Sequence, residues 1–172
     1  MALMVGLLVS FIDSVFSAQV YLEPEKFLEQ AFDGEIPKAK KIYVKGEIRK
    51  KIESILGHKF RGIRIKYWAK GERTAWILEE IGKAHPITTG YLVDQGSISK
   101  VRVLIYRETR GWEVKRPSFT IQFEGATHKS MEYELDREIN NISGATLSVR
   151  ALTKLARIAL YLDDAIKKQA KK

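Results

Sequence analysis

The 172-residue chain contains no cysteine and only three histidines, at positions 58, 85 and 128. Without cysteine it cannot form disulfides, thiolate metal sites, cysteine-ligated iron–sulfur clusters or covalent c-type haem. Because the three histidines are scattered along the chain, we do not expect a three-histidine metal site. Internal repeats, low-complexity tracts and Pro/Gly-rich linkers are also missing. The length therefore indicates a single domain overall.

Long hydrophobic runs are missing too, except for residues 2–12 at the N-terminus. This uncharged run of eleven residues would reach about 16 Å as a helix, which is about half of a bilayer core. It fits the hydrophobic region of a signal peptide better than a spanning helix, and Val15 and Ser17 before Ala18 have the spacing of a cleavage site. We therefore predict a signal peptide over residues 1–17 and a periplasmic or otherwise extracytoplasmic protein. An N-terminal helix packed on the core is the alternative.

Positive charge is concentrated in residues 38–73, which hold 13 Lys or Arg and three Glu, within a chain of net charge +9. Clustered cations interleaved with aromatic residues are typical of nucleic-acid interfaces. Because no recognised nucleic-acid motif is present, we favour a solvated cationic face whose aromatic side chains point into the core. Such a face could also dock an acidic redox partner or anionic lipid headgroups. The aromatic residues concerned are Tyr43, Phe60, Tyr67 and Trp68.

The hydrophobic periodicity predicts an α+β fold, with a twisted antiparallel sheet, flanking helices and a long C-terminal helix. Asp94-Gln95-Gly96 separates two apolar runs and predicts a hairpin turn, because glycine supplies the positive φ that such a turn needs. Helical spacing covers residues 24–32, 48–56 and 143–168, and strand patterns cover 63–68, the region of 75–77, 87–93 and 98–106.

One short segment carries candidate chemistry where the C-terminal helix begins. Residues 140–148 read Asn-Asn-Ile-Ser-Gly-Ala-Thr-Leu-Ser. A helix N-terminus offers free N–H groups to a phosphate, and small residues at Gly144 and Ala145 would allow its close approach. Taken alone, the segment is more simply an ordinary helix start with Ser143 as the N-cap.

A second segment makes the functional interpretation stronger. Residues 106–125 contain Glu108-Thr109-Arg110-Gly111, then Phe119, then Gln122-Phe123-Glu124-Gly125. Together with Ser143 to Thr146, these elements resemble in order and spacing the FMN-binding domain family, which includes the small flavoprotein subunits of Rnf and sodium-translocating NADH:quinone reductase complexes. The resemblance covers about residues 86–160. It divides the chain into a basic helix and strand portion, residues 18–85, and an FMN-binding core, residues 86–172.

The resemblance implies a covalent cofactor. In that family the threonine of Ser-Gly-Ala-Thr is joined to FMN by a phosphoester that a separate Mg²⁺-dependent flavin transferase makes from FAD. Carried over, Thr146 is the attachment residue, and the other members of the site are Ser143, Gly144, Ala145, Ser148, Glu108, Thr109 and Gly111. The family commonly has an acidic residue where Asn140 stands and Pro where Arg110 stands.

Other residues of the second segment have weaker assignments. The side chains of Trp112, Phe119 and Phe123 could pack against the flavin, although aromatic residues at such spacing more often belong to a core. Arg107, Arg110 and Lys115 could stabilise a flavin anion, or they could simply be solvated.

We therefore expect an electron carrier outside the cytoplasm, either associated with a membrane or not. We expect no catalytic residues and no metal site. Its partners would be a flavin transferase and redox proteins, not nucleic acid. No pair of residues resembles an acid–base catalyst, so a substrate-turning enzyme is the weaker interpretation. The alternative function is a domain without flavin that binds nucleic acid or an acidic protein through its basic segment.

Overall fold

The computed structural model describes residues 18–129 and 132–170. The predicted signal peptide, residues 1–17, lies outside this range. The elements, in chain order, are β1 (Gln19–Val20), α1 (Pro24–Ala31), β2 (Lys40–Tyr43), α2 (Gly46–Leu56), β3 (Arg64–Lys70), β4 (Arg73–Ile81), β5 (Pro86–Asp94), β6 (Ser97–Tyr106), η1 (Trp112–Lys115), α3 (Pro117–Thr120), η2 (Ile121–Phe123) and α4 (Thr146–Ala170).

The strands form one sheet in the order β1-β6-β5-β4-β3-β2, and all neighbouring strands are antiparallel. The α+β class with a long C-terminal helix is therefore confirmed. The predicted hairpin is present, since Asp94 pairs with Ser97 and both turn residues have positive φ, 50° at Gln95 and 78° at Gly96. The side chain of Ser97 also donates a hydrogen bond to the carbonyl oxygen of Asp94, at 3.1 Å.

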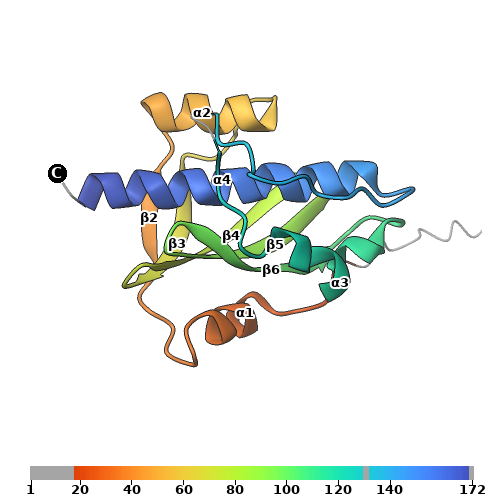
Figure 1. Cartoon of the computed structure of the whole chain (residues 1–172), viewed down its shortest axis with the longest axis horizontal. Coiled ribbons are helices and arrows are strands. Elements are labelled where there is room, and N and C mark those ends of the chain that lie inside the picture. The colour runs from red at the N-terminus through yellow and green to blue at the C-terminus, as the bar shows by residue number, and fades with distance from the viewer. Residues whose placement is uncertain (1–17, 130–131, 171–172) are drawn as a thin grey trace, which may run out of the picture.

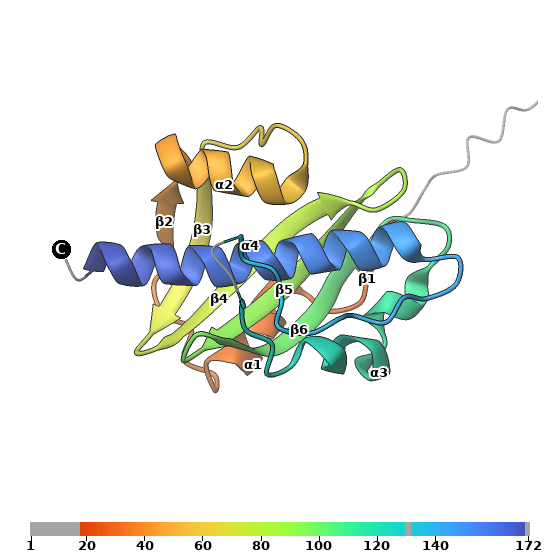
Figure 2. The ribbon, with the colours of Figure 1, turned by 45° about the horizontal axis from the view of Figure 1, so that its top comes forward.

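Helices cover both faces of the sheet, as Figures 1 and 2 show. The long helix α4 crosses one face and α2 lies beside it, while α1 packs on the opposite face. Helices α1 and α4 bury their apolar stripes against the sheet, and α2 packs chiefly against α4. Gly57 ends α2 in the left-handed conformation, with φ 76°.

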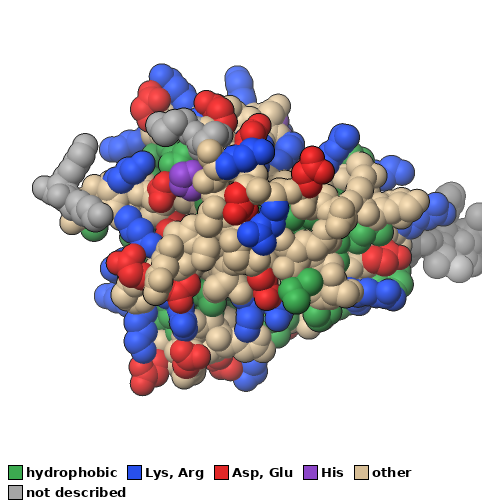
Figure 3. Space-filling model, in the orientation of Figure 1, with side chains coloured by type: hydrophobic (Ala, Val, Ile, Leu, Met, Phe, Trp, Pro, Cys, Tyr) green, Lys and Arg blue, Asp and Glu red, His purple; other side chains and the backbone are tan. Residues whose placement is uncertain are grey.

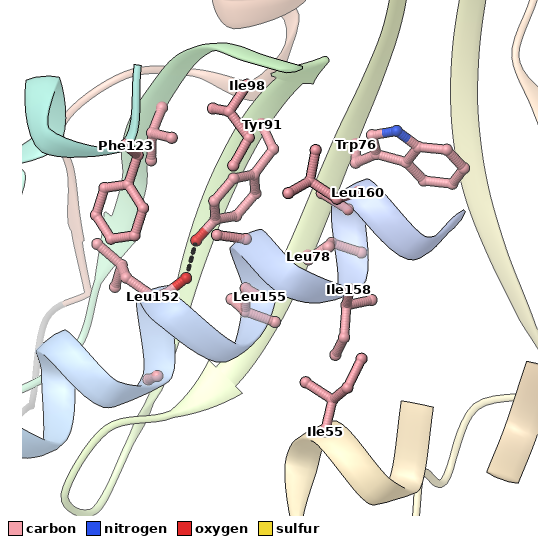
Figure 4. Close-up of a cluster of buried hydrophobic side chains, with 14 of the residues drawn as sticks. Ile55, Trp76, Leu78, Tyr91, Ile98, Phe123, Leu152, Leu155, Ile158 and Leu160 are labelled. Atoms are coloured by element: carbon pink, nitrogen blue, oxygen red, sulfur yellow. Dashed lines mark hydrogen bonds between the residues drawn. The ribbon is translucent and has the colours of Figure 1, made fainter. Parts of the chain in front are cut away.

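The main core lies between α4 and the sheet. Figure 4 shows Leu152 and Leu155 of α4 packed toward Tyr91 and Leu78 of the strands. The phenol of Tyr91 is fully buried and donates a hydrogen bond to the carbonyl oxygen of Leu152, at 2.8 Å. Burial of a leucine side chain stabilises the fold by about 1.5–3 kcal/mol, so α4 is firmly fixed on the sheet.

The start of α4 differs from the prediction. We expected the helix from residue 143 with Ser143 as N-cap, but it begins at Thr146. Gly144 has φ 80°, which an α-helix does not contain, and Ser143 lies with it in a turn. The N–H group of Ala145 closes this turn on the carbonyl oxygen of Ile142, at 2.9 Å.

The aromatic residues of the basic segment do not form a stacking platform. Tyr67 stacks on the buried Trp76, with ring centroids 5.0 Å apart, and Phe60 and Trp68 pack against opposite hydrophobic clusters. Tyr43 is the exception, with 60% of its surface exposed. Among the described residues, there is no helix with the length and hydropathy required to traverse a bilayer.

Candidate functional site

A pocket of about 660 Å³ lies at the N-terminal end of α4. Three chain segments meet there: the turn from β4 to β5, the residues that follow β6, and the first turn of α4. The volume lies in the middle of the range found for small-molecule sites. The pocket is lined by Lys83, Glu108, Thr109, Arg110, Gly144, Ala145, Thr146, Leu147 and Ser148.

Glu108 joins two of these segments. Its Oε1 atom accepts hydrogen bonds from three consecutive backbone N–H groups, of Lys83 at 2.5 Å, Ala84 at 2.7 Å and His85 at 3.0 Å. Burial opposes ionisation of this carboxyl, but the three N–H groups outweigh it and hold the pKa of Glu108 below its usual value. The carboxylate therefore stays charged and fixes the β4–β5 turn against the end of β6.

Two glycines allow the segments to approach this closely. A Cβ atom on Gly82 would lie 2.9 Å from Oε1 of Glu108. A Cβ atom on Gly111 would lie 2.9 Å from the Cβ of Ala145, and Gly111 also has φ 81°. The close approach of Gly111 to Ala145 brings the Glu-Thr-x-Gly and Ser-Gly-Ala-Thr motifs together, although they are far apart in the sequence.

Tyr106 and Ser148 support the floor of the pocket. The buried phenol of Tyr106 donates to the carbonyl oxygen of Arg110, at 2.6 Å, and lies 3.1 Å from Oγ of Ser148. Burial raises the pKa of Tyr106, so the phenol remains protonated and serves as a donor. These bonds connect the end of β6, the Glu-Thr-x-Gly turn and the first turn of α4.

Thr146 is the first residue of α4 and is partly exposed to the pocket. Its Oγ1 atom accepts a hydrogen bond from the side-chain amide of Asn141, at 3.1 Å, and the amide oxygen of Asn141 accepts from the N–H group of Ile142, at 3.0 Å. Asn140, which occupies the position that is acidic in the family, has a different partner: its N–H group donates to Oε1 of Gln122. The residue that contacts the Thr146 hydroxyl is therefore Asn141, which the sequence did not single out.

Most of the predicted site residues meet at this pocket. Glu108, Thr109, Gly144, Ala145, Thr146 and Ser148 all line it. Ser143 and Gly111 do not: Ser143 is exposed in the preceding turn, and Gly111 is buried behind Ala145.

The aromatic candidates divide between core and surface. Phe119 and Phe123 are buried and pack edge to face, with centroids 5.9 Å apart, so they belong to the core. Trp112 is 40% exposed, and the guanidinium of Arg116 lies 4.5 Å from its ring centroid. The Gln-Phe-x-Gly segment does not line the pocket, and its link to the site is Gln122, which accepts a hydrogen bond from the N–H group of Asn140.

The cations at the pocket are Lys83 and Arg110, and the sequence offered no signal for Lys83. Lys83 lies between Gly82 and Ala84 in the turn that joins β4 to β5. Its place at the pocket follows from the position that Glu108 imposes on this turn. Arg107 instead bonds the carbonyl oxygen of Pro86, at 3.0 Å, and the Lys115 ammonium lies 3.4 Å from the ring centroid of Tyr21.

The arrangement is suited to a phosphate. The first-turn N–H groups of α4 have no acceptor within the helix, and the helix dipole places partial positive charge at this end. Lys83 and Arg110 add two full charges beside Thr146. A Cβ atom on Gly144 would meet nothing within 4 Å, so there is open space for such a group to approach the backbone. In the part of the chain that the structure describes, no group of His, Asp and Glu side chains is placed to hold a metal ion.

Comparison with known proteins agrees with this geometry. The sequence profile of the FMN-binding domain family matches residues 82–161. The matched range includes every residue that lines the pocket, from Lys83 in the β4–β5 turn to Ser148 in α4. No curated protein and no solved structure matches the chain.

Proposed function

We propose that the chain carries FMN covalently on Thr146. The basis is that residues 82–161 form a domain of the FMN-binding domain family, which makes the chain a flavin-binding protein. We further propose that it transfers electrons outside the cytoplasm, to and from redox proteins that it meets there or at a membrane. The single observation that carries the covalent attachment is the position of the Thr146 hydroxyl, at the N-terminus of α4 and inside the cationic pocket.

The residues of the pocket fit the phosphate end of FMN. Lys83 and Arg110 would neutralise its charge, and the N–H groups of Leu147 and Ser148 would donate to its oxygens. Gly144 leaves room beside the backbone, and Glu108 and Tyr106 hold the walls in place. When bound, FMN supplies the redox chemistry, and the protein orients and tunes it.

The attachment step balances as a transfer from FAD that a separate flavin transferase performs. The Oγ1 atom of Thr146 forms a bond to the phosphorus of the FMN half, and the bond from that phosphorus to the bridging oxygen breaks. AMP leaves with the bridging oxygen, and the hydroxyl proton passes to a base of the transferase. The side-chain amide of Asn141, 3.1 Å from Oγ1, directs a lone pair of that oxygen toward itself and fixes the side chain for the reaction.

An electron carrier fits the pocket better than an enzyme that turns over a substrate. Its titratable lining residues are Lys83, Glu108 and Arg110, and the Glu108 carboxylate is committed to the β4–β5 turn. A general acid or base needs a free group within reach of the substrate. The apolar run before Ala18 is the reason to propose an extracytoplasmic location.

Intact-protein mass spectrometry after coexpression with a flavin transferase tests the proposal. The wild-type protein should gain the mass of FMN less one water, and Thr146→Ala should gain nothing. Thr109→Ala is the matched control, because it removes the other threonine hydroxyl of the pocket and should still be labelled. Labelling of Thr146→Ala, or no labelling of the wild type, would overturn covalent attachment at Thr146.

The same mass spectra test whether the predicted signal peptide is removed on export. Protein recovered from an exporting host should have lost about the first 17 residues if the predicted signal peptide is cleaved. Retention of residues 1–17 in a correctly folded, flavin-loaded protein would contradict the signal peptide.

A further inference from the structure

The sheet contains a split between β3 and β4. The two strands pair from Tyr67↔Trp76 to Lys70↔Arg73 next to their connecting turn. Beyond Trp76, β4 continues to Ile81 with β5 as its partner, while Arg64 to Lys66 of β3 pair with β2. The pair β2 and β3 thus turns away from the rest of the sheet, as Figure 2 shows.

A slot of about 330 Å³ opens where the strands part. Its inner wall is formed by the side chains of α2, α4 and the strands, which are almost all aliphatic, with Phe60 at the edge. A cavity of this size is at the lower end of the range for small-molecule sites. The apolar lining consists of Ile52, Leu56, Phe60, Ile65, Ile77, Leu78, Leu155 and Ile158.

The mouth of the slot is cationic. Arg64 and Lys66 line it and alternate with the buried Ile65, so both point to the face away from α4, about 6–7 Å apart along the strand. In the register of β2 with β3, Lys41 lies directly opposite Lys66. Like charges in such a pair destabilise a sheet.

No acidic group of the described residues neutralises these charges. Within residues 18–129 and 132–170, Lys41, Arg64 and Lys66 form no ion pair and no side-chain hydrogen bond. Glu79 also lines the slot, but its Oε1 atom accepts from the hydroxyl of Thr88, at 2.5 Å, and lies 3.5 Å from Nη1 of Arg107. On the face that Figure 3 shows, Asp and Glu side chains are mixed with Lys and Arg.

We propose that the slot binds an anionic amphiphile with a single hydrocarbon chain, such as a fatty-acid carboxylate or a lipid phosphate. The hydrocarbon chain lies against the aliphatic wall, and the head group lies between Arg64 and Lys66. Removal of the chain from water drives binding, and the anion relieves the repulsion between Lys41 and Lys66. A neutral apolar ligand would leave those cations unpaired, and a polyanion such as nucleic acid would leave the slot unfilled.

The site is separate from the flavin pocket. The flavin pocket includes Thr146 and Ser148 of α4, whereas the slot includes Leu155 and Ile158. The proposal therefore does not depend on flavin, and the two can be tested independently on the same preparation.

The first experiment compares dodecanoate, dodecyl phosphate and dodecanol by titration calorimetry of the purified protein, below their micellar concentrations. Both anions should bind, and dodecanol should bind at least about tenfold more weakly, because it lacks the charge-assisted contacts. A tighter dodecyl phosphate complex would point to a lipid phosphate, and a tighter dodecanoate complex to a fatty acid. Equal binding of dodecanol, or no binding of either anion, would overturn the proposal.

Two variants locate the site. Arg64→Ala/Lys66→Ala should weaken dodecanoate binding about tenfold or more. Lys38→Ala/Lys40→Ala is the matched control, because it removes two exposed charges from the same basic segment but not from the slot, and it should bind as the wild type does. Equal loss in both variants would show unspecific attraction to positive charge and overturn the slot.

A third variant, Leu78→Phe, fills the slot with a larger side chain. It should abolish dodecanoate binding while retaining a cooperative urea-unfolding transition, which reports that the variant is folded. Unchanged dodecanoate binding in folded Leu78→Phe would overturn the proposed position of the hydrocarbon chain.

Discussion

Gly111→Ala is the sharpest test of how the site is assembled. Gly111 has φ 81°, and a Cβ atom there would lie 2.9 Å from the Cβ of Ala145 and 3.0 Å from the hydroxyl of Tyr106. Neither neighbour is the free end of a flexible chain, since Ala145 precedes α4 and Tyr106 is buried and hydrogen bonded. The substitution should therefore separate the Glu-Thr-x-Gly turn from the start of α4.

The expected magnitude has two parts. A left-handed backbone costs a non-glycine residue about 1–2 kcal/mol. Overpacking of a close contact costs about 1–3 kcal/mol more. The free energy of unfolding of Gly111→Ala should fall by about 2–5 kcal/mol. Gly144→Ala is the matched control, because Gly144 has φ 80° but nothing lies within 4 Å of its Cβ position, so its loss should be limited to about 1–2 kcal/mol.

Urea-induced unfolding of the flavin-free proteins, followed by tryptophan fluorescence, measures both losses. Gly111→Ala should also be labelled more slowly by the transferase, because the pocket wall is displaced. If Gly111→Ala and Gly144→Ala lose the same stability, the contact between the two motifs does not support the fold and this argument is refuted.

Four further perturbations follow from particular contacts. Tyr106→Phe removes the bonds to Arg110 and Ser148 and should lower the free energy of unfolding by about 1–2 kcal/mol; an unchanged urea midpoint would contradict the role of the phenol. Thr74→Val leaves the buried Oδ1 atom of Asp163 and the indole N–H of Trp76 without their partner. It should lower the free energy of unfolding by about 1–3 kcal/mol in the same assay. The control Thr153→Val, at a half-buried position of α4, should lower it by less. The hydrogen bond to Glu80 raises the pKa of His58, so the contribution of this pair to stability is complete below about pH 6.5 and declines as the pH rises through the folded-state pKa. Since the imidazole is 50% exposed, the decline should stay under about 1 kcal/mol. In thermal melts from pH 5 to 9, His58→Asn should abolish this decline. Asn141→Ala should slow labelling of Thr146 about three- to tenfold in a time course of intact mass, and Asn140→Ala should leave the rate unchanged; the reverse order would show that the family's acidic position, not Asn141, governs the hydroxyl.

The sequence by itself determined the fold class and most of the elements. Alternation of apolar residues located the strands from Arg64 to Tyr106, and Asp94-Gln95-Gly96 located their hairpin, because these signals are local. The ordered motifs also indicated the FMN-binding domain family and most residues of the pocket. The start of α4 was less well determined, since Ser143 is an acceptable N-cap and the left-handed Gly144 is not visible from residue type alone.

The tertiary structure decided which distant groups meet. Lys83 reaches the pocket because Glu108, 25 residues later, accepts hydrogen bonds from the N–H groups of the turn that contains Lys83. Asn141 becomes the partner of Thr146 because Gln122 holds the backbone of Asn140. The slot beside Arg64 and Lys66 likewise exists because β3 leaves β4 to pair with β2. Spacing along a chain specifies a helix or a strand, whereas contacts between segments depend on how the packed sheet and helices place them, and this is why the pocket's cations and the slot required the fold.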